Sequence, residues 1–229
     1  YNLARMNMFL HLCLCYTIFC TTPYNLLHRG HNNMCGCYQF TEKQCAEIRQ
    51  IVDAIQRKYG VGSWTPGEIR PTVRAPVLVA GQSYTPSPAL MRWGFLISNG
   101  LVINARAETA AEKPMFRNSV QSRRCLIPST GFFEWDGDRR KYLFTLPGED
   151  VLYIAGLYTH EVDEDQFCIL TTAANKSMRL VHNRMPLILN RNQCQRWLYS
   201  GDDTVSLLSI VPPELVCSSA EAQVSLWDL

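Results

Sequence analysis

"INARAET", residues 103–109, alternates apolar and polar side chains along its whole length. Because neighbouring side chains of a β-strand point to opposite faces, Asn104 and Arg106 are expected to share one face of a strand. An Asn amide beside an Arg guanidinium suits an oriented sugar and a phosphate group. The alternative is a strand whose polar face is solvated and binds nothing.

Short strand-like segments surround this stretch on both sides. They are rich in β-branched and aromatic residues, they are bounded by turn residues, and they cover residues 77–81, 90–97, 101–108, 124–135, 141–146, 151–158 and 166–174. Residues 184–189 are predicted to form a late strand. Two segments, 135–142 and 145–152, are predicted to be hairpin turns between consecutive strands.

Helices are few in the predicted pattern. Residues 41–60 form the clearest one, with Thr41 and Gln44 as a capping box, apolar residues at helical spacing and Gly60 at its end. Shorter helices are predicted at 110–122 and 190–201. Sparse helices and short connections favour the α+β class, with one domain built around a curved mixed sheet or barrel and a few peripheral helices.

Composition narrows the classes of partner. The chain has 47% hydrophobic and 18% charged residues and a net charge of +2, which argues against a broad basic face for duplex DNA. A local group of arginines is still compatible with a short single strand. The ten cysteines form no CxxC pair, so most are expected to be buried free thiols in a reducing compartment. No metal site and no cofactor are predicted.

The first 33 residues differ from the rest. Residues 8–20 form a short apolar run after Arg5, too short to span a bilayer comfortably, and no signal-peptidase site follows it. We interpret residues 1–33 as a leader that is not part of the mature protein, with Met34 as the start of a domain over 34–229. The alternative is a targeting peptide or a removable pro-segment.

Cys35 acquires special chemistry if the chain begins there. Loss of Met34 leaves an α-amine and a thiol on adjacent carbon atoms, a pair that no internal residue offers. The amine attacks an aldehyde to give an imine, and the thiol closes onto the imine carbon to give a five-membered thiazolidine ring. An α-amine titrates at about pH 8, so a useful fraction is neutral at pH 7. The alternative is that Cys35 is one more buried thiol.

Two further residues are candidates for proton transfer. Glu134 lies between Phe133 and Trp135, and a carboxyl in aromatic surroundings tends to have a raised pKa, which suits a general acid and base. His182 precedes an apolar strand and could donate a proton near neutral pH. The alternatives are an exposed Glu between inward aromatic residues and a structural His.

Taken in order, these segments resemble the SRAP (SOS-response-associated peptidase) family. The matching stretches are "MCG" at 34–36, "WG" at 93–94, "INARAET" at 103–109, "GFFEW" at 131–135 and "HNRMPLIL" at 182–189. The resemblance extends from Met34 to about Asn190. Its most specific parts are "INARAET" and the His-x-Arg-Met-Pro segment.

The resemblance implies a DNA-damage sensor of abasic sites in single-stranded DNA. It implies a covalent thiazolidine link between the N-terminal cysteine and the ring-opened sugar, and a peptidase activity that removes what precedes that cysteine. The implied reacting positions are Cys35, Asn104, Glu134 and His182, and the implied DNA contacts are Arg106, Arg184, Trp93 and Arg70. The expected setting is a monomer at the nucleoid of a bacterial cytoplasm, without a membrane partner.

Two features depart from the family pattern. Cys37 stands where the family usually has an arginine, which puts one phosphate contact in doubt. The segment between Trp93 and Asn104 is short, so the aromatic wedge of many members is expected to be reduced. Two other functions are considered: an N-terminal-nucleophile cysteine amidohydrolase acting through Cys35, and a non-covalent single-strand binder whose Trp93 and Phe133 stack on bases.

Overall fold

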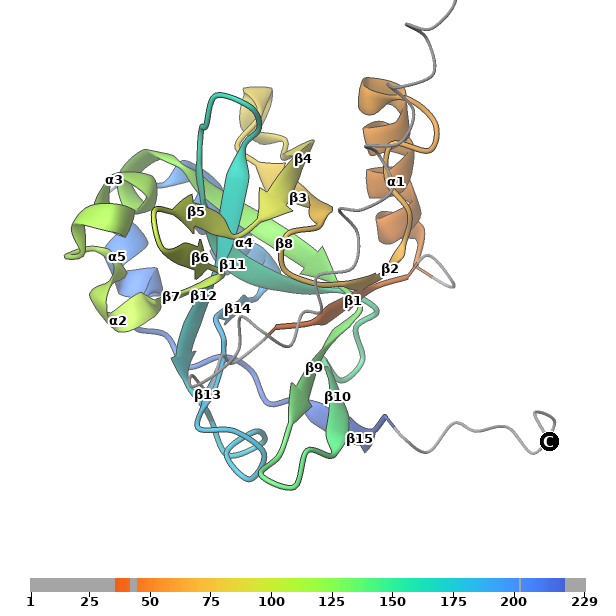
Figure 1. Ribbon diagram of the computed structural model, residues 1–229, viewed down its shortest axis with the longest axis vertical. Helices are drawn as coiled ribbons and strands as arrows, with labels where there is room; N and C mark the ends of the chain where they lie inside the picture. The colour runs from red at the N-terminus through yellow and green to blue at the C-terminus, as the bar shows by residue number, and fades with distance from the viewer. Residues whose placement is uncertain (1–35, 42–44, 202, 221–229) are drawn as a thin grey trace, which may run out of the picture. The chain divides into compact units, whose positions relative to one another are not determined.

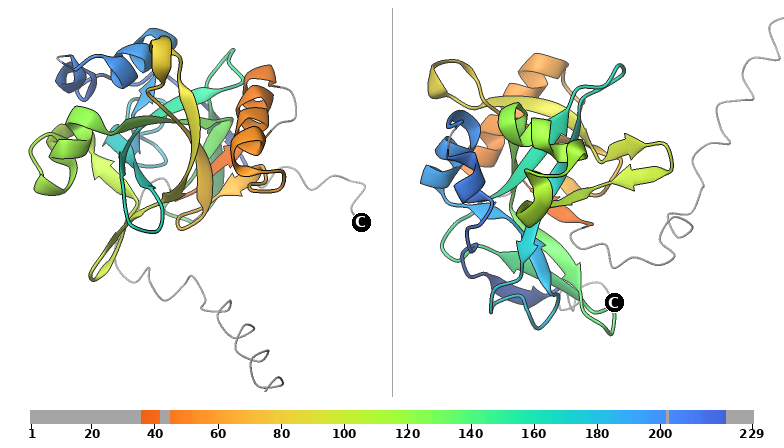
Figure 2. Two further views of the ribbon diagram at one scale, coloured as in Figure 1. Left: turned by 90° about the horizontal axis from the view of Figure 1, so that it is seen from above. Right: turned by 90° about the vertical axis from the view of Figure 1, so that its left-hand side faces the viewer.

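Five strands close into a ring at the centre of the fold (Figure 1). The computed structural model describes residues 36–41, 45–201 and 203–220, and all of them belong to one compact unit, Met34–Leu229. The ring is closed by β12, which pairs antiparallel with β11 and parallel with β4. Figure 2 shows the resulting barrel from above. In spatial order its strands are β12 (Gln166–Ala173), β4 (Ser87–Trp93), β3 (Arg74–Val79), β8 (Arg124–Ser129) and β11 (Leu152–Thr159).

The second half of β12 extends past the ring and pairs with two short strands. Thr171 lies opposite Arg106 on one edge and opposite Pro186 on the other, so β7 and β13 lie on opposite sides of β12. The remaining short strands are a hairpin that follows β4 and a strand that pairs with β11. The bounds of all these strands are β5 (Phe95–Ile97), β6 (Gly100–Val102), β7 (Asn104–Arg106), β13 (Arg184–Pro186) and β14 (Ile188–Leu189).

A second sheet joins parts of the chain that are distant in sequence. Its central strand β9 follows β8 after the single residue Thr130, so one continuous segment enters both sheets. On either side of β9 lie the strand that begins the described chain and the strand that follows β9. In spatial order the strands are β15 (Val216–Ser219), β10 (Lys141–Thr145), β9 (Gly131–Trp135), β1 (Tyr38–Phe40) and β2 (Gly67–Ile69).

Helices cover the outside of the barrel. α1 packs against β3 and β4, whereas α3 and α4 pack against β8 and β11. No helix in the described part of the chain has the length and apolar character needed to cross a bilayer. The helices are α1 (Ala46–Tyr59), α2 (Ala107–Ala110), α3 (Pro114–Ser122), α4 (Arg191–Tyr199) and α5 (Thr204–Leu207), with a 3-10 turn at Gln82–Tyr84.

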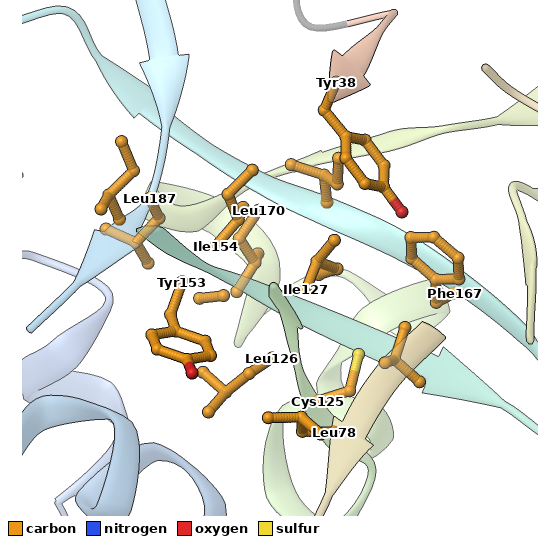
Figure 3. Close-up of a cluster of buried hydrophobic side chains, with 14 of the residues drawn as sticks. Tyr38, Leu78, Cys125, Leu126, Ile127, Tyr153, Ile154, Phe167, Leu170 and Leu187 are labelled. Carbon is orange, nitrogen blue, oxygen red and sulfur yellow. The ribbon is translucent and has the colours of Figure 1, made fainter. Parts of the chain in front are cut away.

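The core fills the barrel. Buried side chains of this cluster include Ile127, Ile154, Phe167 and Leu170 from the barrel strands, and Tyr38 joins them from β1 (Figure 3). Strands β8, β11 and β12 are buried at almost every position because the barrel interior takes one face and the helices cover the other. These strands therefore appear in the sequence as continuous apolar runs and not as alternating patterns.

The α+β class and the curved mixed sheet are confirmed. The helices predicted at 110–122 and 190–201 are present as α3 and α4, although α3 begins only at Pro114 and Ala110 ends the separate helix α2. The predicted capping box at the start of α1 is wrong. The helix begins after Cys45, and the Thr41 hydroxyl instead lies 3.2 Å from that of Thr130. Asn190 and Gln193 make a capping box of this kind at α4.

Several predicted strands are divided in the structure. Residues 90–97 belong partly to β4 and partly to β5, and residues 101–108 belong to β6, β7 and the start of α2. The predicted hairpin at 135–142 is confirmed, since β9 pairs with β10 around Asp136. The predicted hairpin at 145–152 is wrong, because β10 and β11 belong to different sheets. Residues 124–135, predicted to form one strand, are two strands in two sheets, and the predicted strand at 184–189 is interrupted at Leu187.

Candidate functional site

β7 carries the predicted Asn104 and Arg106. Asn104 is half-buried, Ala105 is 2% exposed and Arg106 is exposed, as expected for alternating faces of a strand. Parallel pairing with β12 fixes this strand, with Asn104 opposite Ile169. Asn104 and Arg106 therefore stand on a strand whose apolar side is anchored in the core, whereas Glu108 and Thr109 belong to α2.

Arg184 does not offer a free guanidinium. Its Nη1 and Nη2 donate to the two carboxylate oxygens of Glu108 at 2.5 and 2.8 Å, and Nη2 also donates to the Thr171 carbonyl at 2.6 Å. The Arg184 guanidinium holds the pKa of the Glu108 carboxyl below its usual range. The positive charge of Arg184 is thus largely balanced, unlike the charge of exposed Arg106.

His182 lies two residues before Arg184 and is half-buried. The backbone N–H of Arg184 donates to His182 Nδ1 at 3.0 Å. A nitrogen that accepts a hydrogen bond carries no proton, so the neutral ring has its proton on Nε2. Burial lowers the pKa of the His182 imidazole below its usual range, and the nearby Arg184 charge lowers this pKa further. His182 is therefore a neutral Nε2–H donor near neutral pH.

Glu134 is placed by β9 at only 5% exposure. It lies opposite Tyr142 of β10, and its Oε1 accepts from the Trp135 N–H at 3.3 Å. On the other side of β9, the Phe133 N–H donates to the Cys37 carbonyl at 2.9 Å. The chain that follows Cys35 therefore runs directly beside the strand that carries Glu134. Cys35 itself lies outside the described residues.

Cys37 has polar neighbours that the sequence did not suggest. Its thiol lies 3.7 Å from Glu68 Oε2, and burial raises the pKa of that thiol to about 11, with the Glu68 charge adding to the shift. Glu68 in turn pairs with Lys141 at 2.6 Å and with Arg70 at 2.9 Å. Lys141 Nζ also lies 3.8 Å from the centre of the Phe133 ring. Arg70, a predicted DNA contact, is thus exposed but ion-paired.

Trp93 has a different role from the one predicted. It is fully buried, and its indole N–H donates to the Ile103 carbonyl at 3.0 Å. Its ring packs on Tyr38 of β1, with 5.3 Å between ring centroids. A ring without exposed surface cannot stack on a base, and Phe133 is only 5% exposed. Trp93 instead connects Tyr38 of β1, the strand that follows Cys35, with Ile103, the residue before Asn104.

The structure thus brings the predicted residues into two groups. One group follows β7, β12 and β13 and holds Asn104, Arg106, Arg184 and His182. The other follows β1, β2, β9 and β10 and holds Glu134 and Arg70. Sequence reasoning missed Glu108, Glu68 and Lys141. Of these, Glu108 lies inside "INARAET", and an acidic side chain two residues after Arg106 could have been considered as a partner for an arginine.

A cavity of about 240 Å³ lies away from both groups. It shares no residue with the predicted site, and its mouth carries the Glu47–Arg191 ion pair. Its lining residues are Glu47, Leu78, Pro86, Leu126, Tyr153, Arg191, Cys194 and Gln195.

Comparison with protein families gives one match, and it covers most of the chain. The model of the family described as SOS response associated peptidase (SRAP) matches residues 34–225. The chain belongs to the SRAP family. The family predicted from the ordered motifs is therefore confirmed.

Several curated proteins are similar in sequence to part of this SRAP chain. Abasic site processing protein YoaM of Bacillus subtilis is 40% identical over 106 residues, which are 42% of this chain and 47% of YoaM. YedK of Escherichia coli is 32% identical over 104 residues, 42% of this chain and 47% of YedK. HMCES of Xenopus tropicalis is 25% identical over 164 residues, 55% of this chain and 49% of HMCES. The chain thus spans about half the length of the curated relatives it matches.

Solved structures share the SRAP fold. A protein from Bacteroides thetaiotaomicron matches with a TM-score of 0.66 at 22% identity, covering 81% of this chain and 91% of that one. A phage-related protein from Bordetella bronchiseptica matches with a TM-score of 0.62 at 21% identity, covering 81% and 93% of the two chains. At these identities the likeness supports the fold alone.

Proposed function

We propose that this SRAP chain processes abasic sites in single-stranded DNA and links to them covalently through Cys35. The relatives YoaM, YedK and HMCES are each named abasic site processing proteins, and they share sequence with this chain. In this proposal Cys35 forms the covalent bond to the sugar. Glu134 and His182 transfer or share protons during the reaction, and Asn104 orients the sugar. The protein acts as a monomer at the nucleoid of a bacterial cytoplasm.

The observation that carries the proposal is the pairing of β1 with β9. Tyr38 lies opposite Phe132, and Cys37 pairs through its carbonyl with Phe133. The Cys37 carbonyl, two residues after Cys35, is therefore bonded to the residue next to Glu134 on β9. Trp93 ties the same strand to the residue before Asn104. An N-terminal cysteine at this place would have a buried carboxyl within reach.

The chemistry balances without an oxidant or a reductant. The abasic sugar opens when its C1′ hydroxyl loses a proton, the C1′–O4′ bond breaks and O4′ gains a proton, which leaves an aldehyde. The Cys35 amine adds to C1′, and loss of one water gives an imine. The thiol then adds across the C=N bond, so that sulfur bonds to C1′ and the thiol proton moves to nitrogen.

Glu134 and His182 divide the proton transfers in this proposal. Glu134 takes the proton that the Cys35 amine releases and returns it to the leaving water. His182 serves the sugar oxygen, where a neutral Nε2–H can stabilise developing negative charge by a hydrogen bond. Asn104 orients the sugar, and exposed Arg106 contacts a phosphate.

The same site accounts for a peptidase activity. While a peptide bond precedes Cys35, its nitrogen is an amide and cannot attack an aldehyde. We assign Glu134 to the hydrolysis of that bond, which removes residues 1–33 and Met34 from the working protein. This hydrolysis is a single self-processing event and releases the amine that the cross-link needs.

A denaturing gel with a labelled single strand that holds one abasic site tests the proposal. The wild-type protein, with its N-terminus checked by intact mass, is expected to give a shifted band that resists SDS. Cys35→Ala should give no band because both reacting groups are lost. The matched control is Cys37→Ser, which removes the thiol two residues away and should keep the band.

Two results would contradict the proposal. A band of full strength with Cys35→Ala would place the covalent bond elsewhere. Turnover of small amides without any DNA adduct in the wild type would favour the amidohydrolase. An intact strand without an abasic site serves as the DNA control and should not shift.

A further inference from the structure

Glu108 and Arg184 form a bidentate ion pair that spans β12 and is called the clasp below. Glu108 lies in the first turn of α2, directly after β7, and Arg184 begins β13, so the two residues come from segments on opposite edges of β12. Their bidentate ion pair passes over Thr171, whose carbonyl accepts from Arg184 Nη2 at 2.6 Å. Pro186 lies opposite Thr171 and has no N–H to donate to it. The neighbouring Thr172 hydroxyl donates to Glu108 Oε1 at 3.4 Å.

The clasp uses most of the donors of the Arg184 side chain. A guanidinium has five N–H groups. Nη2 directs its hydrogens at Glu108 and Thr171, and Nη1 directs one at Glu108. The Arg184 side chain is only 19% exposed. A DNA phosphate could therefore not take the two parallel donors of Arg184 without displacing Glu108.

The backbone of Arg184 has a separate task. Its N–H donates to His182 Nδ1 at 3.0 Å, and this bond is what fixes the ring proton on Nε2. His182 stands in the turn that precedes β13, outside the sheet. Arg184 is held at both ends, because its backbone pairs with Ala173 of β12 and its side chain is bonded to Thr171 and Glu108. A residue fixed at both ends keeps its N–H in one direction.

We propose that Glu108 is a positioning residue for His182. By clasping Arg184 across β12, Glu108 fixes the N–H that His182 Nδ1 accepts, and so keeps His182 as an Nε2–H donor aimed at the sugar oxygen. The effect of Glu108 on DNA adducts rests on the proposed function, whereas its effect on the imidazole does not. Arg184 is then part of the support of His182 and not a phosphate contact.

Release of DNA from the purified adduct measures the step that His182 serves. His182→Ala is expected to slow release by about 10²–10⁴-fold, the usual worth of a proton-transfer group. Glu108→Ala should slow it by about 10–10²-fold, because a misplaced group loses that much. In the double variant, loss of Glu108 should add nothing to loss of His182. Glu112→Ala, an exposed acidic residue nearby, is the control and should release as wild type does.

Three outcomes would overturn the inference. The first is release by Glu108→Ala at the wild-type rate, and the second is an equal slowing by Glu108→Ala with and without His182. The third concerns salt. Arg106→Ala should lower the slope of log affinity against log salt by about 0.7, whereas Glu108→Ala/Arg184→Ala removes a neutral pair and should leave the slope unchanged. A fall of about 0.7 in the paired variant would make Arg184 a phosphate contact.

An NMR measurement on the free protein keeps the inference testable without DNA. The ring ¹⁵N shifts of His182, assigned by their loss in His182→Ala, should report a protonated Nε2 and a bare Nδ1. In Glu108→Gln, which keeps the shape of the side chain, the two tautomers should be mixed. A protonated Nδ1 in the wild type would overturn the inference. Failure of the wild type to form any adduct would count against the proposed function and leave this measurement standing.

Discussion

Cys37 illustrates, at the scale of one residue, how burial and a nearby charge decide chemistry. Its thiol is fully buried, lies beside Glu68 and has a pKa raised to about 11. Only the thiolate is a strong nucleophile, so the folded protein keeps this thiol inert at neutral pH. A free Cys35 amine and thiol would therefore face no competition for an aldehyde from the thiol two residues away.

The raised pKa of Cys37 predicts a loss of stability in alkali. Below pH 9 the thiol is protonated in both the folded and the unfolded chain, so its ionisation does not lower the free energy of unfolding. As the pH rises from 9 toward 11, the unfolded chain ionises first, and the free energy of unfolding should fall. Urea unfolding of the wild type and of Cys37→Ser over this range measures the effect. The fall should be smaller in the serine variant, which keeps only the other buried thiols with raised pKa values, such as Cys168 and Cys194. Parallel pH profiles would mean that the folded protein does not exclude this thiolate.

At the residue scale the sequence predicted the motifs but not their partners. Asn104 was a candidate because it alternates with apolar residues, Glu134 because it lies between two aromatic residues, and His182 because it precedes an apolar strand. The Glu108–Arg184 pair, 76 residues apart, was not predictable, because it depends on β7 and β13 flanking β12. Trp93 was assigned to DNA through the family resemblance and as an aromatic ring that could stack on a base, whereas its burial depends on how β1 packs against it.

At the scale of elements, one buried side chain joins two helices. Arg124, at the start of β8, is 8% exposed. Its guanidinium donates to the carbonyls of Val120 and Gln121 at the end of α3 and to that of Trp197 near the end of α4. The last carbonyls of a helix have no partner within the helix, and a cation there also suits the helix dipole. Arg124 thus completes the ends of two helices at once.

Replacement of Arg124 should therefore destabilise the fold. Arg124→Gln leaves several buried carbonyls without donors, at a cost of about 1–3 kcal/mol for each one left unpaired. We expect the free energy of unfolding, measured in urea, to fall by about 3 kcal/mol or more. Arg117→Gln, on the exposed side of α3, is the matched control and should change it by less than about 0.5 kcal/mol. Equal values for the two variants would show that water reaches these carbonyls.

The element boundaries that the sequence missed share a physical reason. The Thr41–Gln44 pattern resembled a cap, but the Thr41 hydroxyl is held by Thr130, to which the pairing of β1 with β9 brings it. Residues 145–152 have the composition of a hairpin turn, yet they carry the chain from one sheet to the other. In both cases a tertiary contact overrode a sound local signal.

At the scale of the whole molecule, the barrel is closed by pairing between strands that are distant in sequence, and no local sequence pattern predicts that pairing. β12 meets β4 in parallel over Gln166 and Phe167, while β11 takes its other edge. Apolar runs predicted the strands and the curved sheet. They could not predict which strand closes the ring, because closure depends on the pairing of strands far apart in the chain.

The pairing of β1 with β9 also sets an order of events during synthesis. Gln39 accepts its hydrogen bond from Thr130, 91 residues later, so at about 5–20 residues/s the first strand waits on the order of 5–20 s for its partner. During that interval a ribosome-bound aminopeptidase can reach the start of the chain, whereas Glu134 has not yet been made. Pulse-labelled chains released by puromycin before residue 134 should therefore retain whatever precedes Cys35 if the protein trims itself, and should lack it if a separate enzyme does the trimming.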